Sequence, residues 1–245
     1  TGWHGRKPGG RRFHRCRPDL GGALAQAGQR QAEAAVRQAE AALRQAPGLD
    51  PKAIEDLICG CAIPEGQQGL NIARIGAVLA GLPTSVGGIT VNRFCASGLS
   101  AVQMAADRIR VGEAEVMIAA GVESMSMVPM MGNSPSLSPT IFEREGDVGI
   151  AYGMGLTAEK VAQQWKISRE DQDAFACWSQ EKTAKATAQG YFEGEIVPVS
   201  IPQRKGEPLV FSKDEFARPT TSIESLAGLR PAFKKDGTVT AGNAS

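Results

Sequence analysis

ITVNRFCASGLSAVQMAADRIRVGEAEVMIAAGVE, residues 89–123, is the most informative stretch of this sequence. It opens with a short β-branched segment and continues with apolar residues at helical spacing from Leu99 to Ile109. Gly112 is expected to end this helix, and the continuous apolar run that follows is typical of a buried strand. Strand, helix and strand with short connections predict a layered α/β sheet.

Cys95 lies where the first predicted strand ends and the predicted helix begins. Ala96, Ser97 and Gly98 are small, so the backbone can turn tightly and another group can approach the sulfur. The positive end of a helix favours a thiolate, which is an activated nucleophile. Unpaired cysteine is also among the most buried residue types, so a small core residue is the alternative reading. The pattern indicates a nucleophile without identifying its reaction.

Further helices and strands are predicted on both sides of this stretch. Before it we expect helices over 32–46, 51–57 and 69–79, with a strand over 57–62. After it we expect helices over 157–165 and 168–188, and short strands over 194–203 and 208–212. Ser168 with Asp171 is a candidate helix N-cap, and Gly190 a candidate terminator. Residues 124–140, rich in methionine, serine and proline, predict a long loop.

Composition excludes several classes of protein. The 245 residues carry a net charge of +1, so bulk charge indicates no nucleic-acid partner. The longest apolar runs are too short to span a bilayer. One glycine separates Cys59 from Cys61, a spacing that fits neither a usual zinc pair nor a redox pair, so we expect core residues and no metal. The scattered, odd-numbered cysteines favour a reducing compartment.

Three blocks resemble the thiolase family, whose members cleave or form 3-oxoacyl-CoA thioesters. The first is VNRFCASGLSAVQMAADRI followed by IAAGVESMSMVP, which is similar to the nucleophile segment. The second, YGMGLTAEKVAQQWKISREDQDAFA, and the third, LRPAFKKDGTVTAGNAS, are similar to segments of the coenzyme A-binding loop domain. The resemblance runs from about Arg17 to Ser245. It implies a layered αβα domain with an inserted mixed α/β loop domain.

The resemblance also implies domain boundaries. Residues 1–16 form an atypical basic arm, 17–124 an incomplete nucleophile domain, and 125–245 the loop domain. The first hydrophobic strand of the family is not found in the arm, and the C-terminal domain of the family has no counterpart. The expected fold is therefore a truncated thiolase fold. In the family a histidine and a second cysteine from that C-terminal domain serve as base and acid, whereas His4 and His14 match no motif. We therefore expect this chain alone to be an inactive fragment.

By the same resemblance, Cys95 accepts an acyl group and its backbone N–H contributes to an oxyanion hole. Coenzyme A, as co-substrate, would lie across the loop domain, with Met154 at the pantetheine tunnel. Arg218 and Ser225 would lie near the nucleotide. The residues expected along the pantetheine arm are Leu229, Ala232, Phe233, Ala241 and Ser245.

The expected function is an acyltransferase that cleaves 3-oxoacyl-CoA, or runs the reverse condensation, through an acyl-cysteine. Gly153 replaces a histidine of many short-chain biosynthetic thiolases, which favours the degradative direction. The resemblance further implies a homodimer or homotetramer and a place in fatty acid β-oxidation, in the cytoplasm or, in a eukaryote, a mitochondrion or peroxisome. Two alternatives stay open: a non-catalytic, partner-dependent acyl-CoA-binding protein, and a decarboxylating ketosynthase, which the long insertion and the GVESMS segment argue against.

Overall fold

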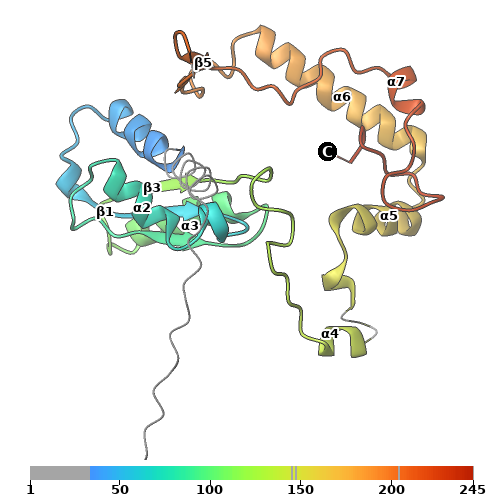
Figure 1. The fold of residues 1–245 in the computed structure, drawn as a ribbon, viewed down its shortest axis with the longest axis horizontal. Coiled ribbons are helices and arrows are strands. Elements are labelled where there is room, and N and C mark those ends of the chain that lie inside the picture. The colour runs from blue at the N-terminus through green and yellow to red at the C-terminus, as the bar shows by residue number, and fades with distance from the viewer. Residues whose placement is uncertain (1–33, 145, 147, 204, 245) are drawn as a thin grey trace, which may run out of the picture. The chain divides into compact units, whose positions relative to one another are not determined.

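The computed structural model describes residues 34–144, 146, 148–203 and 205–244. The predicted basic arm over 1–16 lies outside these residues, as does Ser245. The chain forms two compact units that divide between Pro135 and Ser136. Each unit is drawn in Figure 1 and is described here by itself.

A parallel sheet forms the centre of the first unit (Figure 1). Its strands are β1 (Ile54–Gly60), β2 (Ile89–Val91) and β3 (Val116–Gly121), in the order β2-β1-β3. Both neighbours run parallel to β1, with Ile58 opposite Ile89 and Leu57 opposite Ile118. The buried central strand β1 and the parallel pairing confirm the predicted layered α/β sheet.

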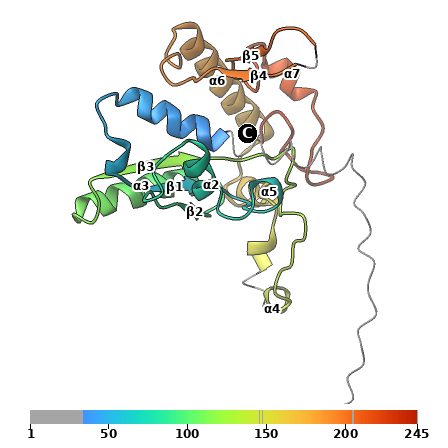
Figure 2. The same ribbon diagram turned by 60° about the vertical axis from the view of Figure 1, so that its left-hand side comes forward.

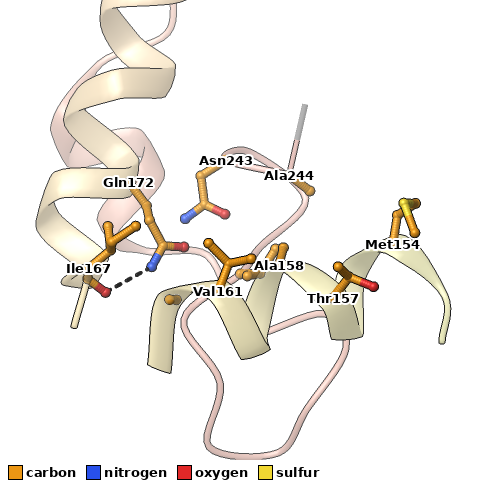
Figure 3. A pocket seen from close by; sticks show the side chains of 10 residues that line it. Met154, Thr157, Ala158, Val161, Ile167, Gln172, Asn243 and Ala244 are labelled. Carbon is orange, nitrogen blue, oxygen red and sulfur yellow. Dashed lines mark hydrogen bonds between the residues drawn. The ribbon is translucent and has the colours of Figure 1, made fainter. Parts of the chain in front are cut away.

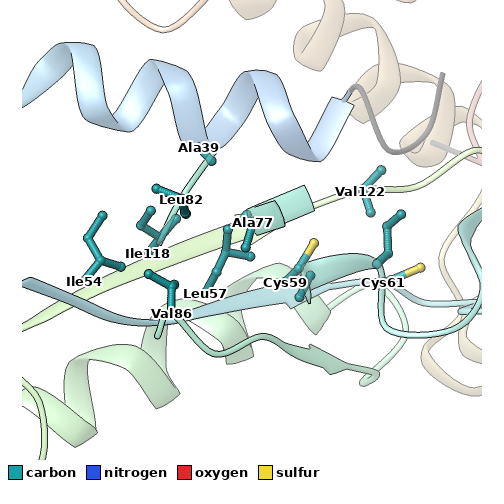
Figure 4. Close-up of a cluster of buried hydrophobic side chains, with 13 residues drawn as sticks. Ala39, Ile54, Leu57, Cys59, Cys61, Ala77, Leu82, Val86, Ile118 and Val122 are labelled. Atoms are coloured by element: carbon teal, nitrogen blue, oxygen red, sulfur yellow. The ribbon is translucent and has the colours of Figure 1, made fainter. Parts of the chain in front are cut away.

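Helices cover both faces of this sheet. On one face a helix over residues 34–45 and α2 (Ile72–Leu79) pack on the side chains of β1 and β3, as Figure 4 shows. On the other face α3 (Ser97–Arg110) packs through Ala101 and Ala105 onto Ile58. Alternate residues of β1 therefore point into two different clusters, as the period of a strand requires. The members of the larger cluster are Ala39, Ile54, Leu57, Cys59, Cys61, Ile72, Ala73, Ala77, Leu82, Val86, Ile118, Ala120 and Val122.

The predicted helix over 51–57 is wrong. Only Pro51–Ala53 forms a single 3-10 turn, η1, which the Asp50 side chain caps by accepting the Lys52 N–H. Strand β1 begins directly afterwards at Ile54, three residues before the predicted start. The reason is tertiary, because Ile54 gains a parallel partner in Val116 and full burial in the core. A second 3-10 turn, η2 (Gly66–Gln68), lies in the loop after β1.

The second unit consists mainly of helices and loops. Its two long helices are α5 (Met154–Trp165) and α6 (Arg169–Ala188). Strands β4 (Val199–Ile201) and β5 (Leu209–Phe211) lie side by side as an antiparallel hairpin (Figure 2). The short elements are α4 (Thr140–Glu143), η3 (Val148–Ala151) and α7 (Ile223–Ala227).

Helix ends in the second unit follow the predicted signals. Ser168 caps α6 in a capping box with Asp171, and Gly190 ends it with a positive φ of 75°. Helix α5 begins at Met154, three residues before the predicted start. No helix in the described part of the chain is both long enough and apolar enough to cross a membrane.

Candidate active site

Cys95 lies between the end of β2 and the start of α3, where the sequence predicts it. Its side chain is exposed, whereas the other cysteines of the described residues, Cys59, Cys61 and Cys177, are buried. Burial raises the pKa of Cys59 to about 12 and that of Cys61 to about 11, so both stay protonated near neutral pH. Both therefore serve as core residues, as predicted, and Cys95 is the accessible thiol of the described residues.

The turn that carries Cys95 is strained. Phe94, directly before the cysteine, has a positive φ of 46°, which is uncommon for a bulky residue. Ser97 holds the turn closed, since its hydroxyl accepts the Arg93 N–H at 2.9 Å and donates to the Phe94 carbonyl at 2.6 Å. The Asn92 side chain accepts the Phe94 N–H at 2.9 Å. Such strain typically costs about 1–3 kcal/mol and is concentrated at functional sites.

Gly60, the last residue of β1, sets the position of the first turn of α3. A Cβ atom at Gly60 would lie 2.5 Å from the Ser97 carbonyl carbon and 2.5 Å from the Gly98 nitrogen. The helix start therefore rests directly on the backbone of the central strand. Sequence reasoning missed Gly60, and it noted Ser97 for its small size but not for the hydrogen bonds of its hydroxyl.

The start of α3 can stabilise negative charge. Ala96 is its N-cap and makes no side-chain hydrogen bond, so no side-chain oxygen caps the first turn. Of the N–H groups there, that of Ser97 donates to the Phe94 carbonyl at 3.0 Å. Arg108 and Arg110 place positive charge in the last turn, at the negative end of the dipole. A sulfur anion or an oxyanion beside Cys95 would face the positive end of this helix.

A pair of side chains joins the loops that follow β1 and β3. Gln68, fully buried, donates to the Glu123 carboxylate at 2.5 Å and accepts the Ser124 N–H at 2.9 Å. Glu123 also accepts the Ala62 N–H at 2.5 Å. These bonds fix the carboxyl edge of the sheet, where ligands of open α/β sheets bind.

The second unit contains an apolar cavity of about 420 Å³ (Figure 3). Met154, at the start of α5, lies on its rim with Thr157, and Ala244 lines the opposite wall. The remaining lining residues are Ala158, Val161, Ala162, Ile167, Gln172, Val239 and Asn243. An apolar cavity of this volume with few polar groups suits an uncharged chain.

Other residues predicted to contact coenzyme A pack on the segments that carry the cavity's lining residues. Phe233 covers Gly155, the neighbour of Met154, so tightly that a Cβ there would lie 2.2 Å from the ring. Leu229 packs against Gly242 in the same way, since a Cβ at Gly242 would lie 2.6 Å from the leucine Cδ1. Ala232 donates its N–H to the Val239 carbonyl at 2.9 Å, and the exposed Ala241 follows in the same returning segment.

Of the described residues predicted to contact coenzyme A, Met154 is the one that lines the cavity. The exposed Arg218 donates its backbone N–H to the Gln180 side chain at 2.8 Å. Ser225 belongs to the capping box of α7 with Ser222, which occupies its hydroxyl. Ser245 lies outside the described residues. Among the residues that are described, no group of three or more His, Cys, Asp or Glu side chains could hold a metal ion.

Comparisons with known proteins agree on one family. A family model described as "Thiolase, N-terminal domain" matches residues 19–245. A "Probable acetyl-CoA acyltransferase" of Staphylococcus aureus (strain COL) is 49% identical over 208 residues, which are 81% of this chain and 53% of that protein. The protein of the same name from strain MSSA476 is 48% identical over the same shares. The chain therefore spans about half the length of these curated relatives.

A solved structure leads to the same family. The "Crystal structure of the Bacillus anthracis acetyl-CoA acetyltransferase" superposes with a TM-score of 0.73 at 38% sequence identity. The match covers 87% of this chain and 56% of that one.

Proposed function

The chain belongs to the thiolase family, and from that premise we propose that it serves acyl transfer to and from coenzyme A through an acyl group on Cys95. The observation that carries the proposal is the exposed Cys95 thiol on a strained turn at the start of α3. A nucleophile in this position meets the positive end of a helix and is open to a thioester.

In the degradative direction, the Cys95 sulfur attacks the 3-oxo carbon of a 3-oxoacyl-CoA. The bond between C2 and C3 then breaks, the acyl group stays on the sulfur, and the acetyl-CoA carbanion takes up a proton. The thiol of a second coenzyme A attacks the acyl-cysteine, which releases acyl-CoA and returns the proton to Cys95. N–H groups at the start of α3 would stabilise the oxyanion of each attack. Condensation runs the same steps in reverse.

The second unit supplies the surface for coenzyme A. Phe233 packs against Gly155, the neighbour of Met154, and Met154 lines the cavity. These contacts support a role for both side chains along the pantetheine arm. Arg218 and Ser225, farther along the chain, would contact the nucleotide. Gly153 in place of a histidine supports the degradative direction, and with it a place in β-oxidation. A homo-oligomer and a cytoplasmic, mitochondrial or peroxisomal location belong to the same proposal.

Proton transfer requires a group that these 245 residues do not offer in a matching motif. Their only histidines are His4 and His14. General base catalysis typically contributes about 10² to 10⁴ in rate. We therefore expect residues 1–245 alone to acylate slowly and not to turn over.

The test is incubation of residues 1–245 with acetyl-CoA, followed by mass mapping of the cysteine peptides. Slow acetylation of Cys95, reversed by added coenzyme A and absent in Cys95→Ser, supports the proposal. Acetylation that persists in Cys95→Ser would contradict it. Coenzyme A binding without any acetylation of Cys95 would instead favour the second candidate, a non-catalytic acyl-CoA-binding protein.

A further inference from the structure

Two carboxylates in the second unit are buried, although neither belongs to the coenzyme A contacts proposed above. Glu159 on α5 is 8% exposed, and Asp173 on α6 is 3% exposed. Removing a carboxylate from water costs several kcal/mol unless hydrogen bonds replace the lost hydration. Both carboxylates are held by such bonds, and in each case a partner lies in the same segment, residues 238–244.

The Glu159 carboxylate binds backbone N–H groups at the start of this segment. One carboxylate oxygen accepts the Thr238 N–H at 3.0 Å and the Val239 N–H at 2.9 Å. The approach depends on Gly237, where a Cβ would lie 2.1 Å from the same carboxylate oxygen. Glycine at this position lets the chain reach the carboxylate.

Asp173 binds the end of the segment through a side chain. Its carboxylate accepts the Asn243 amide at 2.8 Å and the Arg169 guanidinium at 2.8 Å. Asn243 in turn accepts the N–H of Thr240, which is fully buried, at 2.7 Å. Arg169 continues to the Leu226 carbonyl at 2.6 Å. The two carboxylates therefore hold residues 238–244 at both ends.

This segment forms one wall of the cavity. Val239, Asn243 and Ala244 line it together with Met154 and Thr157 of α5. Figure 3 shows Asn243 and Ala244 on the segment and Met154 and Thr157 on the helix. The buried apolar cluster of the second unit contains only Ala176, Cys177 and Leu226, none of which lies in the segment. Leu226 of this cluster packs against Gly242, and the Val239 side chain is itself buried. The two carboxylates therefore set where the wall lies together with these apolar contacts.

We propose that Glu159 and Asp173 are positioning residues for the pantetheine arm of coenzyme A. They set the distance between the 238–244 wall and α5, and so the width available to a thin amide chain. The inference rests on the function proposed above. Because the nucleotide end is assigned to Arg218 and Ser225, the carboxylates act on the arm of the cofactor and leave recognition of its adenosine phosphates unchanged.

The test measures two ligands by titration calorimetry on the 245-residue chain. The probes are coenzyme A and adenosine 3′,5′-bisphosphate, which has the nucleotide without the arm. Glu159→Gln and Asp173→Asn should each bind coenzyme A about tenfold more weakly and bind the bisphosphate as the unchanged chain does. The matched control is Glu170→Gln, an exposed carboxylate on α6, which should bind both ligands normally. Equal weakening for both ligands would indicate a merely structural role and overturn the inference.

A second variant covers the case in which loss of a buried carboxylate unfolds the unit. Gly237→Ala keeps both carboxylates and pushes the segment away from Glu159, so it should show the same selective loss for coenzyme A. Unchanged affinity for coenzyme A in Gly237→Ala or Glu159→Gln overturns the inference and leaves the proposed function standing. Failure of the unchanged chain to bind coenzyme A overturns the proposed binding function, and this inference with it.

Discussion

Each of the two units is stabilised internally by a different kind of interaction. In the first unit, β1 carries apolar side chains into clusters on both faces of the sheet, and helices cover both. In the second unit the buried apolar cluster has three members, and buried carboxylates bind the returning chain. An apolar core resists displacement in every direction, whereas a few hydrogen bonds fix particular groups. We infer that the nucleophile requires a rigid supporting sheet, whereas the coenzyme A surface requires only a few groups held in place.

The largest expected effect comes from truncating a buried leucine in each unit. Leu57→Ala removes a fully buried side chain from the middle of the larger cluster and should lower the free energy of unfolding by about 4 kcal/mol. Leu226→Ala, in the three-member cluster, should cost about 2 kcal/mol because its surroundings collapse more easily. Urea unfolding followed by hydrogen exchange separates the units. Equal losses would contradict the difference between them.

A larger residue beneath the turn that carries Cys95 should lower the free energy of unfolding by nearly as much. Gly60→Ala places a methyl group against the backbone of Ser97 and Gly98 and should destabilise the first unit by about 3 kcal/mol. It should also change the rate at which iodoacetamide alkylates Cys95. The control is Gly98→Ala, whose Cβ would meet nothing within 4 Å and which should be neutral or slightly stabilising. If both variants behave alike, Gly60 does not set the position of α3.

A smaller effect is expected from the ion pair between β1 and α3. Arg108 donates to Asp56 at 2.8 Å, and their side chains are 26% and 12% exposed. This hydrogen bond is the main reason that the pKa of Arg108 is raised. Arg108→Ala should cost about 2 kcal/mol, between the values for buried and exposed pairs.

Arg110 offers the matched control for that experiment. Its pair with Asp107 is 72% and 51% exposed, so Arg110→Ala should change stability by less than about 0.5 kcal/mol. Thermal unfolding of both variants, at low and at high salt, measures the difference. A loss for Arg110→Ala as large as that for Arg108→Ala would show that burial does not govern these pairs.

Alkaline pH should weaken the first unit gradually. The folded pKa values of Cys59 and Cys61, about 12 and about 11, lie above the value of an exposed thiol, about 8.5. The folded state therefore binds more protons, and its stability falls as the pH rises above about 8.5 toward 11. Urea unfolding across this range should show the decline, and Cys59→Ala with Cys61→Ala should flatten it. An unchanged slope would assign the decline to other groups.

The sequence predicts the first unit better than the second. Residues 89–123 show strand, helix and strand in their periodicity, because both faces of that sheet are apolar and the pattern is strong. Cys95 could be located for the same reason, since a strand-to-helix junction has a local signature. The prediction of a helix over 51–57 was wrong because the parallel strand pairing of Ile54 outweighed the helical tendency of its neighbours.

The capping box of Ser168 and Asp171 has a local signature, but the long-range polar interactions of the second unit have none. Glu159 and Thr238 are far apart in the chain, and a buried glutamate on a helix looks like an exposed one in sequence. Gly60 has no local signature either, because a small residue gives no sign of what approaches it. The size of Ser97 indicates the tight turn, but nothing local predicts the hydrogen bonds of its hydroxyl. The strain at Phe94 is likewise found only in the structure, since phenylalanine is not a residue type from which a positive φ is expected.

The most direct test of the central claim is affinity labelling of Cys95 with bromoacetyl-CoA, a coenzyme A thioester that alkylates thiolates. Its rate on residues 1–245 is compared with that of bromoacetamide, which lacks the cofactor, and peptides are mapped by mass spectrometry. The account predicts labelling at Cys95 that is faster, saturates with concentration and slows when coenzyme A is added. Labelling of Cys95 no faster than with bromoacetamide, and unaffected by coenzyme A, would contradict it.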